Sequence, residues 1–89
     1  MIGKAVLDVK PGDRFFNIVS KGEPNVIPGQ KPGSRYFSRV VSVKKDRWYV
    51  HFTCEIENSR KEPIGQTHVR SYKRGERCLI LEPKVTSDV

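Results

Sequence analysis

Residues 47–56, RWYVHFTCEI, alternate strictly between two kinds of side chain. The even positions carry the mainly apolar set, Trp48, Val50, Phe52, Cys54 and Ile56, and the odd positions carry Arg47, Tyr49, His51, Thr53 and Glu55. Successive side chains of a strand point to opposite faces of its sheet, whereas a helix would scatter the apolar set around its axis. The stretch therefore predicts a strand with the even set, including Trp48, in the core and the odd set in water.

Glycine and proline divide the rest of the chain into further short strands. The segments rich in β-branched and aromatic residues are 2–9, 14–20, 36–43, 66–72 and 77–81. Turns are predicted at 10–13, 44–46 and 73–76, a polar linker at 57–65, and a long loop rich in proline and glycine at 21–34. Together these segments predict an all-β fold, a small antiparallel barrel of five to six strands, because closure removes exposed strand edges.

Length and composition narrow the class of protein. Eighty-nine residues with 36% hydrophobic and 30% charged side chains predict one globular domain at 1–82, followed by a flexible tail at 83–89. No apolar run approaches the roughly 18 residues that a membrane helix needs, and the first ten residues contain no apolar signal core. Two cysteines, Cys54 and Cys78, allow one bridge at most. We expect two free thiols and a cytoplasmic protein.

The chain is strongly basic. Seventeen Lys and Arg against ten Asp and Glu give a net charge of +7, of which residues 35–80 carry +6. Such a surplus attracts polyanions, either nucleic acid or acidic protein surfaces, although a basic surface can also serve solubility alone.

Basic and aromatic side chains are interleaved on the faces predicted to be wet. Arg47, Tyr49 and His51 share one face of their strand, and the even positions from 68 to 74 form a similar set. Cations neutralise phosphates, and rings stack on unpaired bases, so two such neighbouring strands would make a nucleic-acid platform. Cross-strand packing also favours these residues. The candidate nucleic-acid-binding residues are Arg39, Lys44, Lys45, Arg47, Tyr49, His51, His68, Arg70, Tyr72, Lys73 and Arg74.

The residues that could bind metal or act in catalysis form no recognisable motif. His51 and Cys54 are three positions apart on one predicted strand and so point to opposite faces, which disfavours a zinc site. Nucleophile, metalloprotease and phosphate-loop motifs are absent from the sequence. We expect no metal, no cofactor and no enzymatic activity.

Two stretches resemble SH3-like barrels of the KOW and Tudor type. Residues 9–15, VKPGDRF, are similar to the entry into the first strand of those barrels, and residues 39–43 through 47–52 are similar to their central hairpin. The resemblance implies a binding module for nucleic acid or protein, as found in transcription, translation and chromatin proteins.

The sequence therefore predicts a non-catalytic nucleic-acid-binding module. The alternative is a small regulator or inhibitor that docks on an acidic surface of a larger transcription, translation or nuclease assembly. Val26, Ile27 and Lys31 of the long loop would contact that partner. A structural subunit of a larger particle is a third possibility.

Overall fold

The chain, described here by a computed structural model at residues 1–21 and 29–81, contains six strands and one short helix. The strands are β1 (Ile2–Ala5), β2 (Arg14–Ile18), β3 (Arg35–Lys45), β4 (Tyr49–Glu57), β5 (Pro63–Lys73) and β6 (Arg77–Ile80), and a 3₁₀ helix, η1, spans Val6–Asp8. All strand pairs are antiparallel, which confirms the all-β prediction. The first strand is shorter than predicted because η1 interrupts it, and β5 begins three residues earlier, at Pro63.

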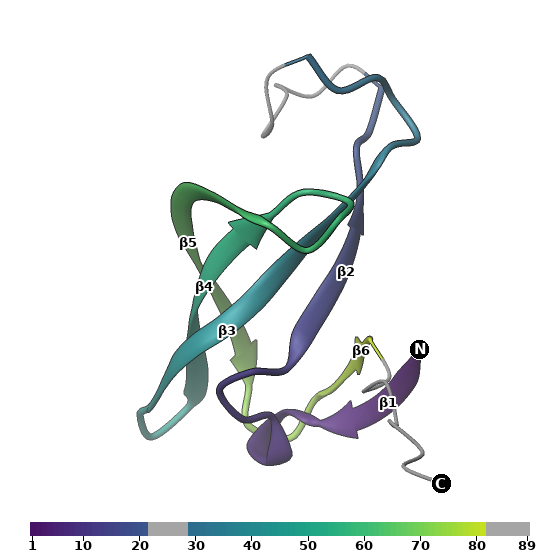
Figure 1. The fold of residues 1–89 in the computed structure, drawn as a ribbon. Helices are drawn as coiled ribbons and strands as arrows, with labels where there is room; N and C mark the ends of the chain where they lie inside the picture. Colours follow the sequence, from purple (N-terminus) through teal and green to yellow (C-terminus); the bar gives the residue numbers. More distant parts are fainter. Residues whose placement is uncertain (22–28, 82–89) are drawn as a thin grey trace, which may run out of the picture.

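The strands form two sheets (Figure 1). Four of them follow one another as a meander in the order β2-β3-β4-β5, and β1 pairs with β6 in a separate ribbon. The amide of Leu81, directly after β6, donates to the carbonyl of Arg14 in β2 at 2.7 Å and so joins the ribbon to the meander. Within residues 1–21 and 29–81 no closed barrel is detected.

Two irregularities interrupt the ladders of the four-stranded sheet. One lies between Val40 and Ser42 of β3, and the other between Glu55 and Glu57 where β4 meets β5. Opposite the second, Gly65 has φ of +82°, a conformation that a residue with a side chain rarely adopts. Bulges bend strands and increase their twist, so the sheet curls and presents an inner and an outer face.

The core lies on the inner face. Val50, Phe52, Cys54 and Ile56 are buried there, as the alternation in 47–56 predicts. The prediction for Trp48 is wrong, because this residue is 65% exposed. Since β4 begins at Tyr49, the indole belongs to the preceding turn and the alternation does not extend to it.

The inner face also carries the row His68, Arg70 and Tyr72 of β5. Arg70 lies opposite Phe52 in the antiparallel register, and all three side chains are half-buried. The prediction that this row faces water beside Tyr49 is therefore wrong. The sequence around it does not alternate clearly, because Val69, an apolar residue, occupies the exposed odd face.

Ion pairs tie the outer face of β2, β3 and β4 together. The carboxylate of Glu57, only 2% exposed, accepts from Nε of Arg14 at 2.7 Å and from Nε of Arg39 at 3.2 Å. Arg39 also donates through Nη2 to Glu55 at 3.1 Å. A buried carboxylate with two guanidinium partners is satisfied by charge-assisted hydrogen bonds, and its pairing also neutralises these cations.

The predicted tail at 83–89 and residues 22–28 of the long loop lie outside the described ranges. No helix found in the described ranges is long and apolar enough to cross a membrane.

Candidate nucleic-acid interface

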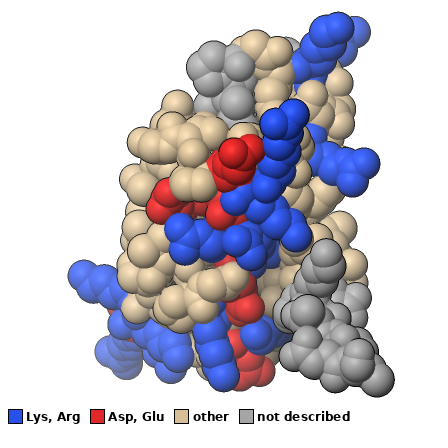
Figure 2. Space-filling model, viewed as in Figure 1, with Lys and Arg blue, Asp and Glu red and all other residues tan. Residues whose placement is uncertain are grey.

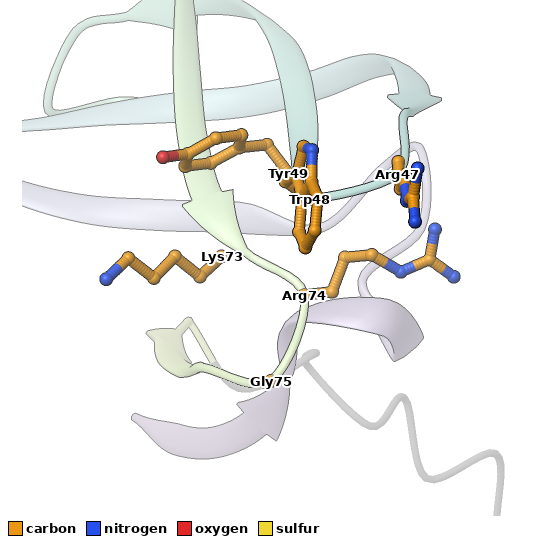
Figure 3. A pocket seen from close by; sticks show the side chains of 6 residues that line it. All are labelled: Arg47, Trp48, Tyr49, Lys73, Arg74 and Gly75. Carbon is orange, nitrogen blue, oxygen red and sulfur yellow. The ribbon is translucent and has the colours of Figure 1, made fainter.

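Two turns meet at one end of the curled sheet. The turn between β3 and β4 carries Arg47 and Trp48, and the turn between β5 and β6 carries Arg74. The amide of Arg74 donates to the carbonyl of Trp48 at 3.1 Å, and its guanidinium donates to the carbonyl of Asp46 at 2.7 Å. These turns surround an open hollow of about 430 Å³ (Figure 3). We call its side chains the hairpin cluster: Arg47, Trp48, Tyr49, Lys73 and Arg74.

Asp46 fixes the backbone of the first turn. Its Oδ1 accepts from the amides of Trp48 at 2.8 Å and Tyr49 at 2.6 Å, and its Oδ2 is 2.7 Å from Nε2 of His51. The hydrogen bonds from His51, Tyr49 and Trp48 lower the pKa of Asp46 to about 2. The carboxylate stays ionised at neutral pH and holds the start of β4 in place, as Asp side chains do in many turns.

The indole of Trp48 stands in the middle of the hairpin cluster. Figure 3 shows Tyr49 and Lys73 reaching to one side of it and Arg47 and Arg74 lying on the other. The guanidinium of Arg47 is 5.0 Å from the centre of the indole ring, a distance typical of cation–π contact. In the described ranges no aromatic ring packs against the indole. A large apolar surface is thus left in water and surrounded by cations.

Lys44 and Lys45 extend this basic surface along the end of β3. Both are exposed, and Lys44 lies opposite His51 on the outer face. Figure 2 shows Lys and Arg gathered at the lower left, where the turn between β3 and β4 lies, whereas acidic and basic atoms alternate across the middle of this face. The end of the sheet therefore carries concentrated positive charge that the ion pairs of Glu57 do not reach.

The structure brings together six of the eleven candidate residues: Lys44, Lys45, Arg47, Tyr49, Lys73 and Arg74. His51 is half-buried between Asp46 and Ser71, and Nδ1 of His51 lies 2.7 Å from the hydroxyl of Ser71. Arg39 is engaged by two carboxylates farther along the sheet. Of the alternative partner residues, Lys31 is exposed, whereas Val26 and Ile27 lie outside the described residues.

The remaining three candidates belong to a network on the inner face. Arg70 donates to Oδ1 of Asn17 at 2.9 Å, and the side-chain Nδ2 of Asn17 donates to the hydroxyl of Ser38 at 2.9 Å. That hydroxyl is 2.8 Å from Nε2 of His68. Tyr72 packs against two aromatic rings of the core, and its ring centre lies 5.8 Å from that of Phe15 and 5.9 Å from that of Phe52. These side chains stabilise the fold and lie outside the hairpin cluster.

Sequence reasoning missed Trp48 as a surface residue. Asp46 was a usable indication, because aspartate side chains commonly form turns by accepting hydrogen bonds from the backbone shortly after them. Such a turn places the following residues, Arg47 and Trp48, before the first paired position of the next strand.

The described ranges contain neither a cluster of metal-binding side chains nor a thiol with a lowered pKa. No group of three or more His, Cys, Asp and Glu side chains there could hold a metal ion. Cys54 and Cys78 are free and buried, and burial raises the pKa of the Cys54 thiol to about 11 and that of Cys78 above its usual range. His51 and Cys54 lie on opposite faces of β4, as predicted from their spacing.

No protein-family model, curated protein or solved structure matches the chain.

Proposed function

We propose that this protein is a non-catalytic, cytoplasmic nucleic-acid-binding module that uses the hairpin cluster, together with Lys44 and Lys45, to contact phosphates. It would need no metal or cofactor for this purpose. The fold would belong to the SH3-like small barrels, whose members act as binding modules; the β2–β5 meander and its curl support that assignment.

One observation carries the proposal: two turns distant in sequence are hydrogen-bonded to each other and concentrate five cations at one end of the sheet. The contact runs from Arg74 to the carbonyls of Asp46 and Trp48. These two turns contain two carboxylates: Asp46 is hydrogen-bonded to backbone amides and to His51, and Glu76 forms no ion pair with a cation of the described residues. The five cations are Lys44, Lys45, Arg47, Lys73 and Arg74.

The physical reason is the energetics of polyanion binding. A phosphate backbone carries closely spaced negative charges with condensed counterions, and cations that displace them gain free energy from their release. Lys44, Lys45 and Lys73 are exposed, and a lysine carries its ammonium group on a flexible stem, which suits phosphates in varied positions. Contacts of this kind position a nucleic acid without reading its sequence.

The proposal is tested by measuring affinity for a labelled oligonucleotide over a salt series. If all five cations meet phosphates, log Kd should change with log salt with a slope of about 3.5 to 4.5 in magnitude. The double variant Lys44→Gln/Lys73→Gln should reduce that slope by about 0.7 to 0.9 per removed charge.

The matched control is Lys31→Gln/Arg60→Gln, which removes two exposed cations near the opposite ends of β3 and β4. It should leave the slope unchanged. Equal losses in both double variants would mean that net charge alone drives the association. Absence of salt-dependent binding, with capture of an acidic protein partner instead, would favour the regulator hypothesis.

A further inference from the structure

We infer that the hairpin cluster binds single-stranded nucleic acid, with an unpaired base stacked on the indole of Trp48. This inference rests on the proposed function and names the class of nucleic acid that the site takes. Trp48 is 65% exposed and stands beside the 42% exposed Tyr49. Aromatic side chains left in water on a basic surface are the usual stacking platforms of single-strand-binding proteins.

The backbone that carries the indole is held by hydrogen bonds in the absence of a ligand. The amide of Trp48 donates to Oδ1 of Asp46 at 2.8 Å, and its carbonyl accepts from the amide of Arg74 at 3.1 Å. Arg47 stacks within 5.0 Å of the ring centre. A turn that is already ordered loses little conformational entropy when a ligand binds. More of the stacking free energy therefore contributes to the affinity.

The surroundings of the ring suit a nucleotide. The hollow beside it is open to solvent and is lined by Lys73 and Tyr49 as well as by the two arginines. Figure 3 shows Lys73 and Arg74 reaching away from the indole in opposite directions, so a strand crossing the ring would meet a cation on either side. The cluster therefore offers one aromatic surface for a base and flanking charges for the adjoining phosphates.

A duplex fits this arrangement less well. In paired nucleic acid the faces of the bases are covered by their neighbours, and exposing one costs a few kcal/mol of unstacking. A single strand presents the faces of its bases without that cost. We therefore expect the phosphate contacts to act on both forms and the contact with Trp48 to act on the single strand alone.

The experiment uses the fluorescence of the protein itself, because Trp48 is the only tryptophan in the sequence. Oligothymidylate and a duplex of the same length are titrated into the intact chain, and affinity is measured in parallel by anisotropy of labelled oligonucleotides. We expect oligothymidylate to quench Trp48 and to bind about 5- to 100-fold more tightly than the duplex, the range that one base–aromatic stack supplies.

Three variants separate stacking from charge. Trp48→Ala should weaken binding to oligothymidylate by about 5- to 100-fold without changing the salt slope. Trp48→Tyr should restore most of the affinity, since it returns an aromatic ring. Leu79→Ala, which truncates a 60% exposed apolar side chain on β6, is the matched control and should bind as the unchanged protein does.

The outcomes distinguish this inference from the proposed function. Salt-dependent binding of both oligonucleotides with equal affinity and unchanged Trp48 fluorescence would overturn the inference and leave phosphate binding intact. Equal affinity of Trp48→Ala and the unchanged protein for oligothymidylate would overturn it as well. Binding to neither oligonucleotide would overturn both.

Discussion

Arg70 of β5 stacks its guanidinium on the ring of Phe15 in β2, 4.3 Å from the ring centre. These two strands are the outermost members of the four-stranded sheet, and no backbone ladder joins them. The link is extended by hydrogen bonds from Arg70 to Asn17 at 2.9 Å and to the hydroxyl of Tyr72 at 3.1 Å. Side-chain contacts between β2 and β5, above all those of Arg70, therefore stabilise the curled shape of the four-stranded sheet.

Arg70→Ala should destabilise the fold by about 2–3 kcal/mol, because it removes a cation–π contact and charge-assisted hydrogen bonds at a half-buried site. Urea unfolding checks this value. Lys73→Ala, three residues away on the outer face, is the control and should change stability by less than about 0.5 kcal/mol. An Arg70→Ala protein that is as stable as the original and has lost nucleic-acid affinity would place Arg70 in the interface.

Glu57→Gln should also destabilise the protein, since it leaves Arg14 and Arg39 without their shared buried carboxylate. The expected loss is about 2–3 kcal/mol, lower than for a fully buried pair because both arginines are about one-third exposed. Glu55→Gln should cost less than about 1 kcal/mol, because the side chain of Glu55 is 29% exposed whereas that of Glu57 is 3% exposed. Equal costs in the two variants would show that burial of Glu57 contributes nothing.

Stability should depend on the protonation of His68. Burial, and then the charge of Arg70, lower the pKa of His68 from its ordinary value of 6.5. The stabilisation that neutral His68 gives to the fold is therefore complete above about pH 6.5 and is lost as the pH falls through the lowered pKa. Denaturant unfolding from pH 8 to 5 should show this decline, and His68→Gln should reduce it. Parallel pH profiles for the two proteins would contradict the assignment.

The turn that presents Trp48 should withstand acid until the carboxylate of Asp46 is protonated. Because the pKa of Asp46 is about 2, against an ordinary 3.8, its contribution is complete above about pH 4 and is lost as the pH falls toward 2. Trp48 fluorescence should report this transition. Asp46→Asn should remove it, and its persistence in that variant would mean that another group is responsible.

The two thiols should be unreactive in the folded protein. Burial raises the pKa of Cys54 to about 11, and Cys78 is also buried with a raised pKa. An aromatic disulfide reagent at pH 8 should therefore label neither cysteine quickly, whereas both should react at once in urea. Rapid labelling of Cys54 in native buffer would contradict its place in the core.

Much of the fold could be predicted from local patterns. The alternation of 50–56 identifies the core side of β4, because the partner strands leave one face of this segment buried and the other wet. The hairpin between β3 and β4 was predicted, although its turn lies at 46–48 and two residues of the predicted turn, Lys44 and Lys45, belong to β3. The pairing of β1 with β6 could not be derived, since it depends on contacts between Ile2 and Ile80 that no local pattern encodes.

The candidate site was only partly predictable. Lys44, Lys45 and Arg47 follow from the turn, but the position of Lys73 and Arg74 beside them depends on the register of β4 with β5. The same register decides that Arg70 faces the core, opposite Phe52, although its charge suggested a surface position. Whether Trp48 belongs to the core depends on where β4 begins: the strand predicted from Arg47 starts two residues later, at Tyr49, and this shift leaves Trp48 in the turn.

The ribbon formed by β1 and β6 has a consequence for the order of folding. Each strand of the meander pairs with its neighbour in sequence, across connections that range from 46–48 between β3 and β4 to 19–34 between β2 and β3. The ribbon instead joins Ile2 to Ile80, and such a distant contact carries a larger closure entropy. We expect the ribbon to assemble last, and its amides to exchange with deuterium before those of β4.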